Sequence, residues 1–136
     1  MTAIQNSPTV QLTLGSMTHI GRVRSANEDS SAAMLPPNAP AGCGGLLIVC
    51  DGMGGHQAGD FASNTAVSTF VSFLRGMPAD ALSPARAAET LKAAAEAANV
   101  KVFGESNTIE RAGMGTTLTA AIVSGPVLAL AHVGDS

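Results

Sequence analysis

Residues 46–63, LLIVCDGMGGHQAGDFAS, decide how the fold is organised. The apolar run at 46–50 has the length of a strand and no polar interruption, so it predicts a central strand that is buried on both faces. The glycine-rich stretch 51–55 ends the run and predicts a turn. Asp60 then predicts the N-cap of a helix whose apolar residues recur at helical spacing. A buried strand that leads through a turn into a helix therefore forms the centre of the predicted domain.

The segments before this stretch predict two more strands. Residues 9–18, TVQLTLGSMT, alternate apolar and polar side chains, which is typical of a half-buried strand. A loop over 19–29 and a short strand over 30–35 are expected next. The segment 36–45 holds three prolines and three glycines, and it predicts the loop that enters the central strand.

The segments after it predict two helices and a hairpin. The first helix is expected to end near Gly76, and an alanine-rich second helix is expected to begin at Ser83 and run to Phe103. The apolar stripe of the second helix should pack on the sheet. It consists of Ala87, Leu91, Ala94, Ala95, Ala98 and Val102. Residues 116–123 and 127–133 are rich in strand formers and predict the hairpin. Strands, then helices, then strands indicate an α+β fold.

Composition narrows the function classes. The chain has 136 residues, a net charge of −3 and only 12% charged residues, and it shows no Lys/Arg cluster of the kind that binds nucleic acid. No apolar run reaches the length of a membrane span, so no membrane partner is expected. The two cysteines lie in unlike contexts and predict free thiols in a reducing cytoplasm. Residues 1–8 are expected to be a flexible N-terminus.

Carboxylates follow the predicted strands. Asp51 comes directly after the central strand. Either a hard cation such as Mg²⁺ compensates its charge there, or Asp51 caps a turn. Glu28 and Asp29 follow the N-terminal strand region. Arg24 has two interpretations: its guanidinium could bind two oxygens of a phosphate group, or it is an ordinary surface residue. His56 is a candidate proton carrier or a turn residue. The three histidines of the chain are not spaced as the ligands of a zinc site are.

Four segments together resemble one known family. They are GRVRSANED at 21–29, VCDGMGGHQAGDFAS at 49–63, MGTTLTAA at 114–121 and AHVGDS at 131–136. In this order and spacing they resemble the type 2C, or PPM, metal-dependent serine/threonine protein phosphatases. DGMGGH is similar to the bacterial branch of the family. Residues 9–136 would then form a partial PPM-type domain.

The resemblance implies a four-layer α-β-β-α sandwich, of which this chain supplies about the N-terminal half. It implies two Mn²⁺ or Mg²⁺ ions, with Asp51 bridging them, Gly52 offering a backbone carbonyl, and Asp29 binding directly or through water. Glu28 would lie beside them, and Asp135 resembles a position tied to a third, weaker metal in some members. Arg24 would bind the substrate phosphate.

The attacking group in this family is a metal-activated water, so the resemblance implies no protein nucleophile. The substrate would be a protein phosphorylated on serine or threonine, and the partner system a cognate Ser/Thr kinase. Two alternatives stay open: a catalytically inactive phosphatase-like remnant or interaction module, and an unrelated metal-binding domain. As a fragment on its own, the chain is expected to be unstable and nearly inactive, because truncation exposes sheet edges and apolar surface.

Overall fold

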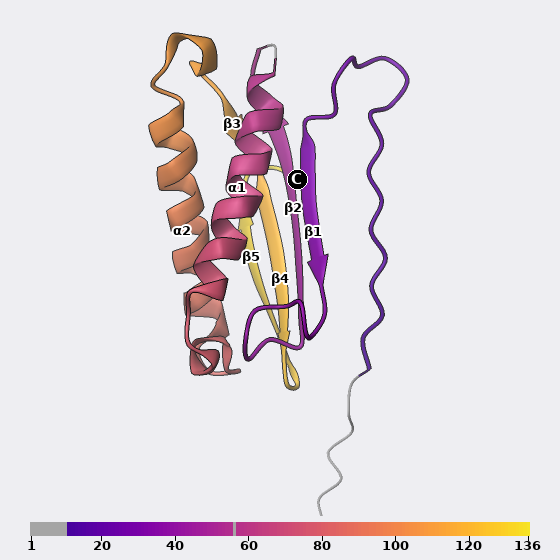
Figure 1. The fold of residues 1–136 in the computed structure, drawn as a ribbon, viewed down its shortest axis with the longest axis vertical. Coiled ribbons are helices and arrows are strands. Elements are labelled where there is room, and N and C mark those ends of the chain that lie inside the picture. Colours follow the sequence, from indigo (N-terminus) through magenta and orange to yellow (C-terminus); the bar gives the residue numbers. More distant parts are fainter. Residues whose placement is uncertain (1–10, 56) are drawn as a thin grey trace, which may run out of the picture.

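A single antiparallel sheet with two helices packed on one of its faces makes up the fold of the computed structural model, which describes residues 11–55 and 57–136 (Figure 1). The strands are β1 (Asp29–Met34), β2 (Gly45–Met53), β3 (Gly115–Thr116), β4 (Leu118–Ser124) and β5 (Val127–Val133). The helices are α1 (Ala58–Arg75) and α2 (Ala87–Glu105), with short 3₁₀ turns η1 (Ala79–Leu82) and η2 (Ile109–Arg111). The expected α+β class is confirmed, and the described residues contribute one helical layer and one sheet.

The sheet follows the order β1-β2-β4-β5, and β3 pairs with the far end of β2. The predicted hairpin is confirmed as β4 and β5, which are joined by a tight turn in which Gly125 has a φ of +55°. The long strand β2 is central, as the apolar run predicted. It also continues to Met53, because Gly52 and Met53 pair with β3, so the turn expected at 51–55 begins later.

The hydrophobic core lies between the sheet and the helices. Leu46, Ile48 and Cys50 point from β2 toward α1, where Phe70 and Leu74 are fully buried. Figure 1 shows α1 and α2 side by side along the sheet. The predicted stripe of α2 is confirmed by the burial of its residues Ala87, Leu91, Ala94, Ala98 and Val102, with Ala95 packed at its edge.

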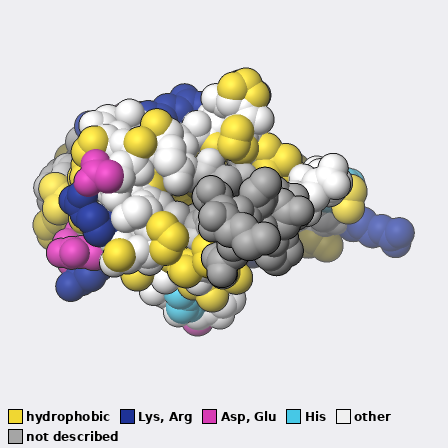
Figure 2. Space-filling model, turned by 90° about the horizontal axis from the view of Figure 1, so that it is seen from below, with side chains coloured by type: hydrophobic (Ala, Val, Ile, Leu, Met, Phe, Trp, Pro, Cys, Tyr) yellow, Lys and Arg dark blue, Asp and Glu magenta, His cyan; other side chains and the backbone are white. Residues whose placement is uncertain are grey.

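The opposite face of the sheet is open, which contradicts the expectation that β2 is buried on both faces. Leu47 and Val49 alternate with the core residues of β2 and are 43% and 55% exposed, and Leu130 of β5 is 63% exposed. The helices cover only one face, so the apolar residues of the other face meet solvent. Figure 2 likewise shows apolar side chains at the surface of the end seen from below.

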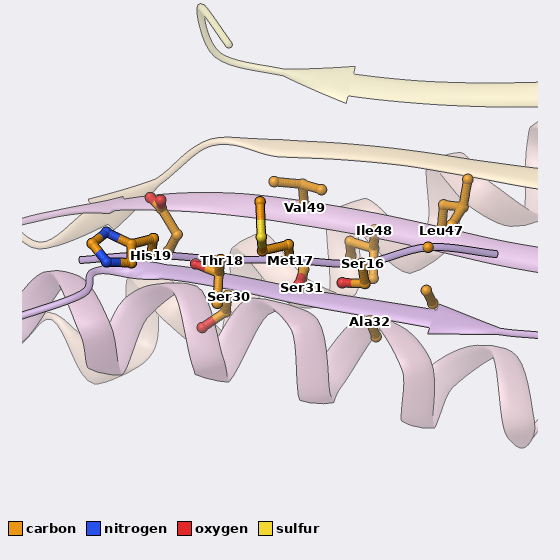
Figure 3. Close-up of a pocket in the computed structure, with 13 residues that line it drawn as sticks. Ser16, Met17, Thr18, His19, Ser30, Ser31, Ala32, Leu47, Ile48 and Val49 are labelled. Carbon is orange, nitrogen blue, oxygen red and sulfur yellow. The ribbon is translucent and has the colours of Figure 1, made fainter. Parts of the chain in front are cut away.

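The segment before β1 is extended but forms no strand within its described part. Leu12 and Leu14 are half-buried between exposed neighbours, so the predicted alternation is present. The strand prediction is nevertheless wrong for residues 11–18, because no neighbouring strand supplies backbone hydrogen bonds to them. Residues 9–10, and the predicted flexible end at 1–8, lie outside the described residues. Residues 15–19 border a hollow of about 360 Å³ over β1 and β2 (Figure 3).

Both helices begin elsewhere than predicted. Helix α1 starts two residues before Asp60, whose carboxylate accepts a hydrogen bond from the Asn64 amide instead of capping the helix. Helix α2 starts at Ala87, because Ser83 precedes a proline and is held in an extended conformation. The predicted end of α1 at Gly76 is confirmed. None of the helices in the described ranges is long and apolar enough to cross a bilayer.

Candidate metal centre

Two carboxylates meet at the end of the sheet where β1 begins and β2 nears its end. The antiparallel register pairs Asp29 of β1 directly with Asp51 of β2. Directly opposed residues point to the same face, and their Cα atoms lie about 4.5–5.5 Å apart in such pairs. Both side chains are exposed on the open face of the sheet. The structure thus brings together Asp29 and Asp51, two of the four carboxylates that were predicted as metal ligands.

The pair is electrostatically unfavourable as it stands. Partial burial raises the pKa of the Asp29 carboxyl above its ordinary value, and the neighbouring Asp51 carboxylate raises it further. The Arg24 guanidinium opposes this shift only in part, by lowering the pKa. Two carboxylates held side by side favour a cation between them, and oxygen ligands suit Mg²⁺ and Mn²⁺. The donor set therefore fits a hard divalent metal.

The backbone around Gly52 is packed too closely for any side chain. A Cβ atom there would overlap the carbonyl oxygen of Gly59 and lie 2.7 Å from that of Glu28. The Gly52 N–H donates to the Glu28 carbonyl over 3.0 Å. Glycine at 52 therefore lets β2, the start of β1 and the first turn of α1 converge beside the carboxylates.

Threonines fix the backbone of Asp51. The Asp51 carbonyl accepts hydrogen bonds from the Thr117 N–H at 2.9 Å and from the Thr116 hydroxyl at 3.0 Å. The Asp51 N–H donates to the Thr117 hydroxyl at 3.0 Å. On the other strand, the Asn27 side chain accepts from the Asp29 N–H at 3.1 Å. Sequence reasoning assigned no role to these residues, although all three stand inside the segments 21–29 and 114–121 that carry the resemblance.

Arg24 and Glu28 lie next to the carboxylate pair. Their side chains form an ion pair at 3.4 Å, and the Arg24 side chain is 64% exposed. Together with Gly54 and three loop residues they line a hollow of about 350 Å³. Arg24 therefore has both solvent access and space for an anion.

Glu28 and Asp135 are not gathered into the pair. Within 11–55 and 57–136, no three His, Cys, Asp or Glu side chains come together as a metal-binding group. Glu28 turns to Arg24 and lies against Gly59, and Asp135 lies exposed in the turn after β5. Their metal roles stay predictions. His56 lies outside the described residues, and Met53 is exposed at the end of β2.

Comparison with known proteins identifies the family. The family model described as protein phosphatase 2C matches residues 22–136. The chain belongs to the protein phosphatase 2C family. It is 38% identical over 120 residues to the serine/threonine phosphatase stp of Listeria monocytogenes, and 38% identical over 117 residues to the serine/threonine protein phosphatase PstP of Mycobacterium tuberculosis. The matches cover 85% of this chain, but only 44% of stp and 20% of PstP.

Solved structures of the family share the fold. The serine/threonine phosphatase of S. agalactiae superposes with a TM-score of 0.75 at 32% identity, over 88% of this chain and 47% of that protein. The catalytic domain of PstP, solved in complex with two manganese ions, gives 0.66 at 35% identity, over 85% of this chain and 45% of that domain. The resemblance found in the four sequence segments is therefore confirmed. This protein phosphatase 2C chain spans about half the length of the catalytic domains that it matches.

Proposed function

We propose that the protein hydrolyses phosphoserine and phosphothreonine esters on proteins, and that this chain supplies part of the metal centre and the phosphate-binding residue. The observation that carries the proposal is the register that sets Asp29 opposite Asp51 in a member of this family. The named relatives, which are serine/threonine phosphatases, support the reaction and the substrate class. The manganese complex of PstP supports Mn²⁺ or Mg²⁺ as the cofactor.

Each residue has a defined task in this proposal. Asp29, Asp51 and the Gly52 carbonyl would hold two divalent cations, with Glu28 beside them and Asp135 holding a third, weaker ion. The bound metals would supply a water of lowered pKa and would neutralise the phosphoryl oxygens. Arg24 would exchange its long contact with Glu28 for a bidentate contact with the substrate phosphate. The open face beside Arg24 leaves room for the protein that carries the phosphate.

The cellular setting is also part of the proposal. A Ser/Thr kinase that phosphorylates the same proteins would form the opposing activity, since a phosphatase of this class needs such a supply of substrate. Both cysteines are free and buried in the structure. Free thiols support the predicted cytoplasmic location, where thiols stay reduced.

Mn²⁺-dependent hydrolysis of p-nitrophenyl phosphate and of a phosphothreonine peptide by the full-length protein tests the proposal. We expect Asp51→Asn to lower kcat/KM by about 100-fold or more, because loss of even an outer partner of a metal ligand costs about 10- to 100-fold. Asp80→Asn is the matched control, since Asp80 is exposed, pairs with Arg86, and lies in η1 beyond the C-terminal end of α1, whereas the carboxylate pair lies near the start of α1. Equal activity of the two variants would contradict the proposal.

A non-catalytic phosphatase-like module remains the second candidate. In the described ranges Asp29 and Asp51 are paired with no third His, Cys, Asp or Glu beside them, and a module without further ligands would hold a cation through these two carboxylates alone. In that case the full-length protein would bind Mn²⁺ only weakly and would hydrolyse neither substrate at any Mn²⁺ concentration. Measurable turnover that Asp51→Asn removes would exclude this candidate.

A further inference from the structure

Thr117 stands opposite Asp51 and breaks the regular ladder there. Gly52 pairs with Thr116 and Val49 with Thr119, so the register places Thr117 across from Asp51. In a regular hydrogen-bonded pair, each residue's N–H donates to the other's carbonyl. Here the Thr117 N–H donates to the Asp51 carbonyl, but the Asp51 N–H donates to the Thr117 hydroxyl. A side-chain oxygen has replaced a backbone carbonyl at the position of the proposed bridging ligand.

The same side chain contacts both neighbours of Asp135. The Ser136 hydroxyl donates to the Thr117 hydroxyl oxygen at 2.6 Å. On the other side, Gly134 has a φ of +106°, and a Cβ atom there would lie 2.8 Å from the Thr117 methyl carbon. The chain end after β5 accordingly lies near β2 in Figure 1. Thr117 is only 4% exposed, so these contacts are sheltered from water.

We propose that Thr117 is a positioning residue that fixes the turn carrying Asp135 to the backbone of Asp51. The inference rests on the proposed metal centre, because it concerns how far apart two of its carboxylates are held. The hydroxyl oxygen accepts one hydrogen bond from each side, and the methyl group fills the space beside Gly134. Both substituents of the threonine Cβ are therefore used, which explains why this residue type suits the position.

Removing the Thr117 hydroxyl would break its hydrogen bonds to Asp51 and to Ser136 at once. Thr117→Val keeps the shape of the side chain but leaves the Asp51 N–H without its acceptor and the Ser136 hydroxyl without its partner. We expect it to raise the Kd for Mn²⁺ by about 10- to 100-fold, the range typical of outer partners of metal ligands. Thr117→Ser restores the hydroxyl and should retain most of the affinity. The readout is Mn²⁺ binding to the full-length protein by calorimetry, which needs no substrate.

Thr90→Val is the matched control for stability. The Thr90 hydroxyl is also buried and donates to the Ala81 carbonyl at 2.7 Å, on the helical side of the core. Both valine variants remove one buried hydroxyl, so we expect both to lower the melting temperature of the metal-free protein. Only Thr117→Val should weaken Mn²⁺ binding. An unchanged Kd in Thr117→Val would overturn the inference.

Asp51→Asn separates failure of this inference from failure of the proposed function. If Asp51→Asn abolishes Mn²⁺ binding and Thr117→Val has no effect, the metal centre stands and the positioning role is wrong. If Asp51→Asn also leaves binding unchanged, both are wrong. Should Thr117→Val not fold, Ser136→Ala decides the matter, because it removes only the outer hydrogen bond. Weaker Mn²⁺ binding would then support the inference, and unchanged binding would overturn it.

Discussion

Replacing Asp29 by asparagine should stabilise the metal-free protein while weakening its metal binding. Asp29 and Asp51 are directly paired, and their like charges oppose folding when no cation lies between them. At a separation of about 5 Å the repulsion is about 0.8 kcal/mol in water and about 3 kcal/mol at an effective dielectric of 20. Because both carboxylates are exposed, solvent screening favours the lower value. We expect Asp29→Asn to gain about 1 kcal/mol, or about 4 °C in melting temperature for a chain of this size.

Thermal unfolding followed by circular dichroism in EDTA at low salt measures this gain. The gain should shrink in 1 M salt, where the Debye length falls to about 3 Å. With Mn²⁺ at 100 times its Kd, the unsubstituted protein should gain about 2.7 kcal/mol, and Asp29→Asn should gain much less. Asp29→Asn should therefore be the more stable of the two proteins in EDTA, and the unsubstituted protein the more stable in Mn²⁺.

Glu96→Gln is the control for this substitution. It also removes one negative charge, but Glu96 lies 3.8 Å from Lys92 on the exposed side of α2, so its loss should not stabilise. A lower melting temperature for Asp29→Asn in EDTA would refute the reasoning, as would an equal gain for Glu96→Gln. Either result would mean that the two carboxylates do not repel each other in the folded protein.

Three further outcomes follow from the packing. Gly52→Ala should unfold the site end of the sheet and abolish Mn²⁺ binding, because its Cβ would overlap the Gly59 carbonyl; calorimetry with Mn²⁺ and circular dichroism check this. Burial raises the pKa of the Cys50 thiol to about 12, so Cys50 should resist alkylation by iodoacetamide at pH 8 until urea unfolds the protein. Labelling of Cys50 before urea is added, detected by mass spectrometry, would contradict this. The folded state keeps this thiol protonated, so its contribution to stability is complete below pH 9 and declines as the pH rises toward 12. Leu130→Thr should reduce aggregation of the 136-residue chain, measured by light scattering, without lowering its melting temperature, because Leu130 is 63% exposed on the open face.

The open face explains why the chain on its own is expected to be unstable. Leu47, Val49 and Leu130 place apolar surface where a buried layer would be expected in a sandwich. The sequence pattern at 46–50 is uninterrupted because it is suited to burial on both faces. The described residues bury only one of the two faces, so Leu47 and Val49 on the other face stay exposed to solvent.

The sequence by itself predicted the strands β1, β2, β4 and β5 and offered Glu28, Asp29, Asp51 and Asp135 as candidate metal ligands. Four of its segments also resemble the family that the comparisons then identified. The strands depend on local chemistry, namely strand-forming runs bounded by glycine-rich turns, whereas the roles of most of the candidate ligands come from the resemblance to the family. The alternation at 11–18 was also present, yet it could not establish a strand, because a strand requires a partner for its backbone hydrogen bonds.

Only the tertiary structure decided which carboxylates meet. The register of β1 on β2 pairs Asp29 with Asp51 and leaves Glu28 with Arg24, and a slip of one residue would have reversed the faces. The same is true of Thr117, whose hydroxyl reaches Asp51 across 66 positions of sequence. Contacts of this kind depend on how distant segments pack, and no local pattern encodes that geometry.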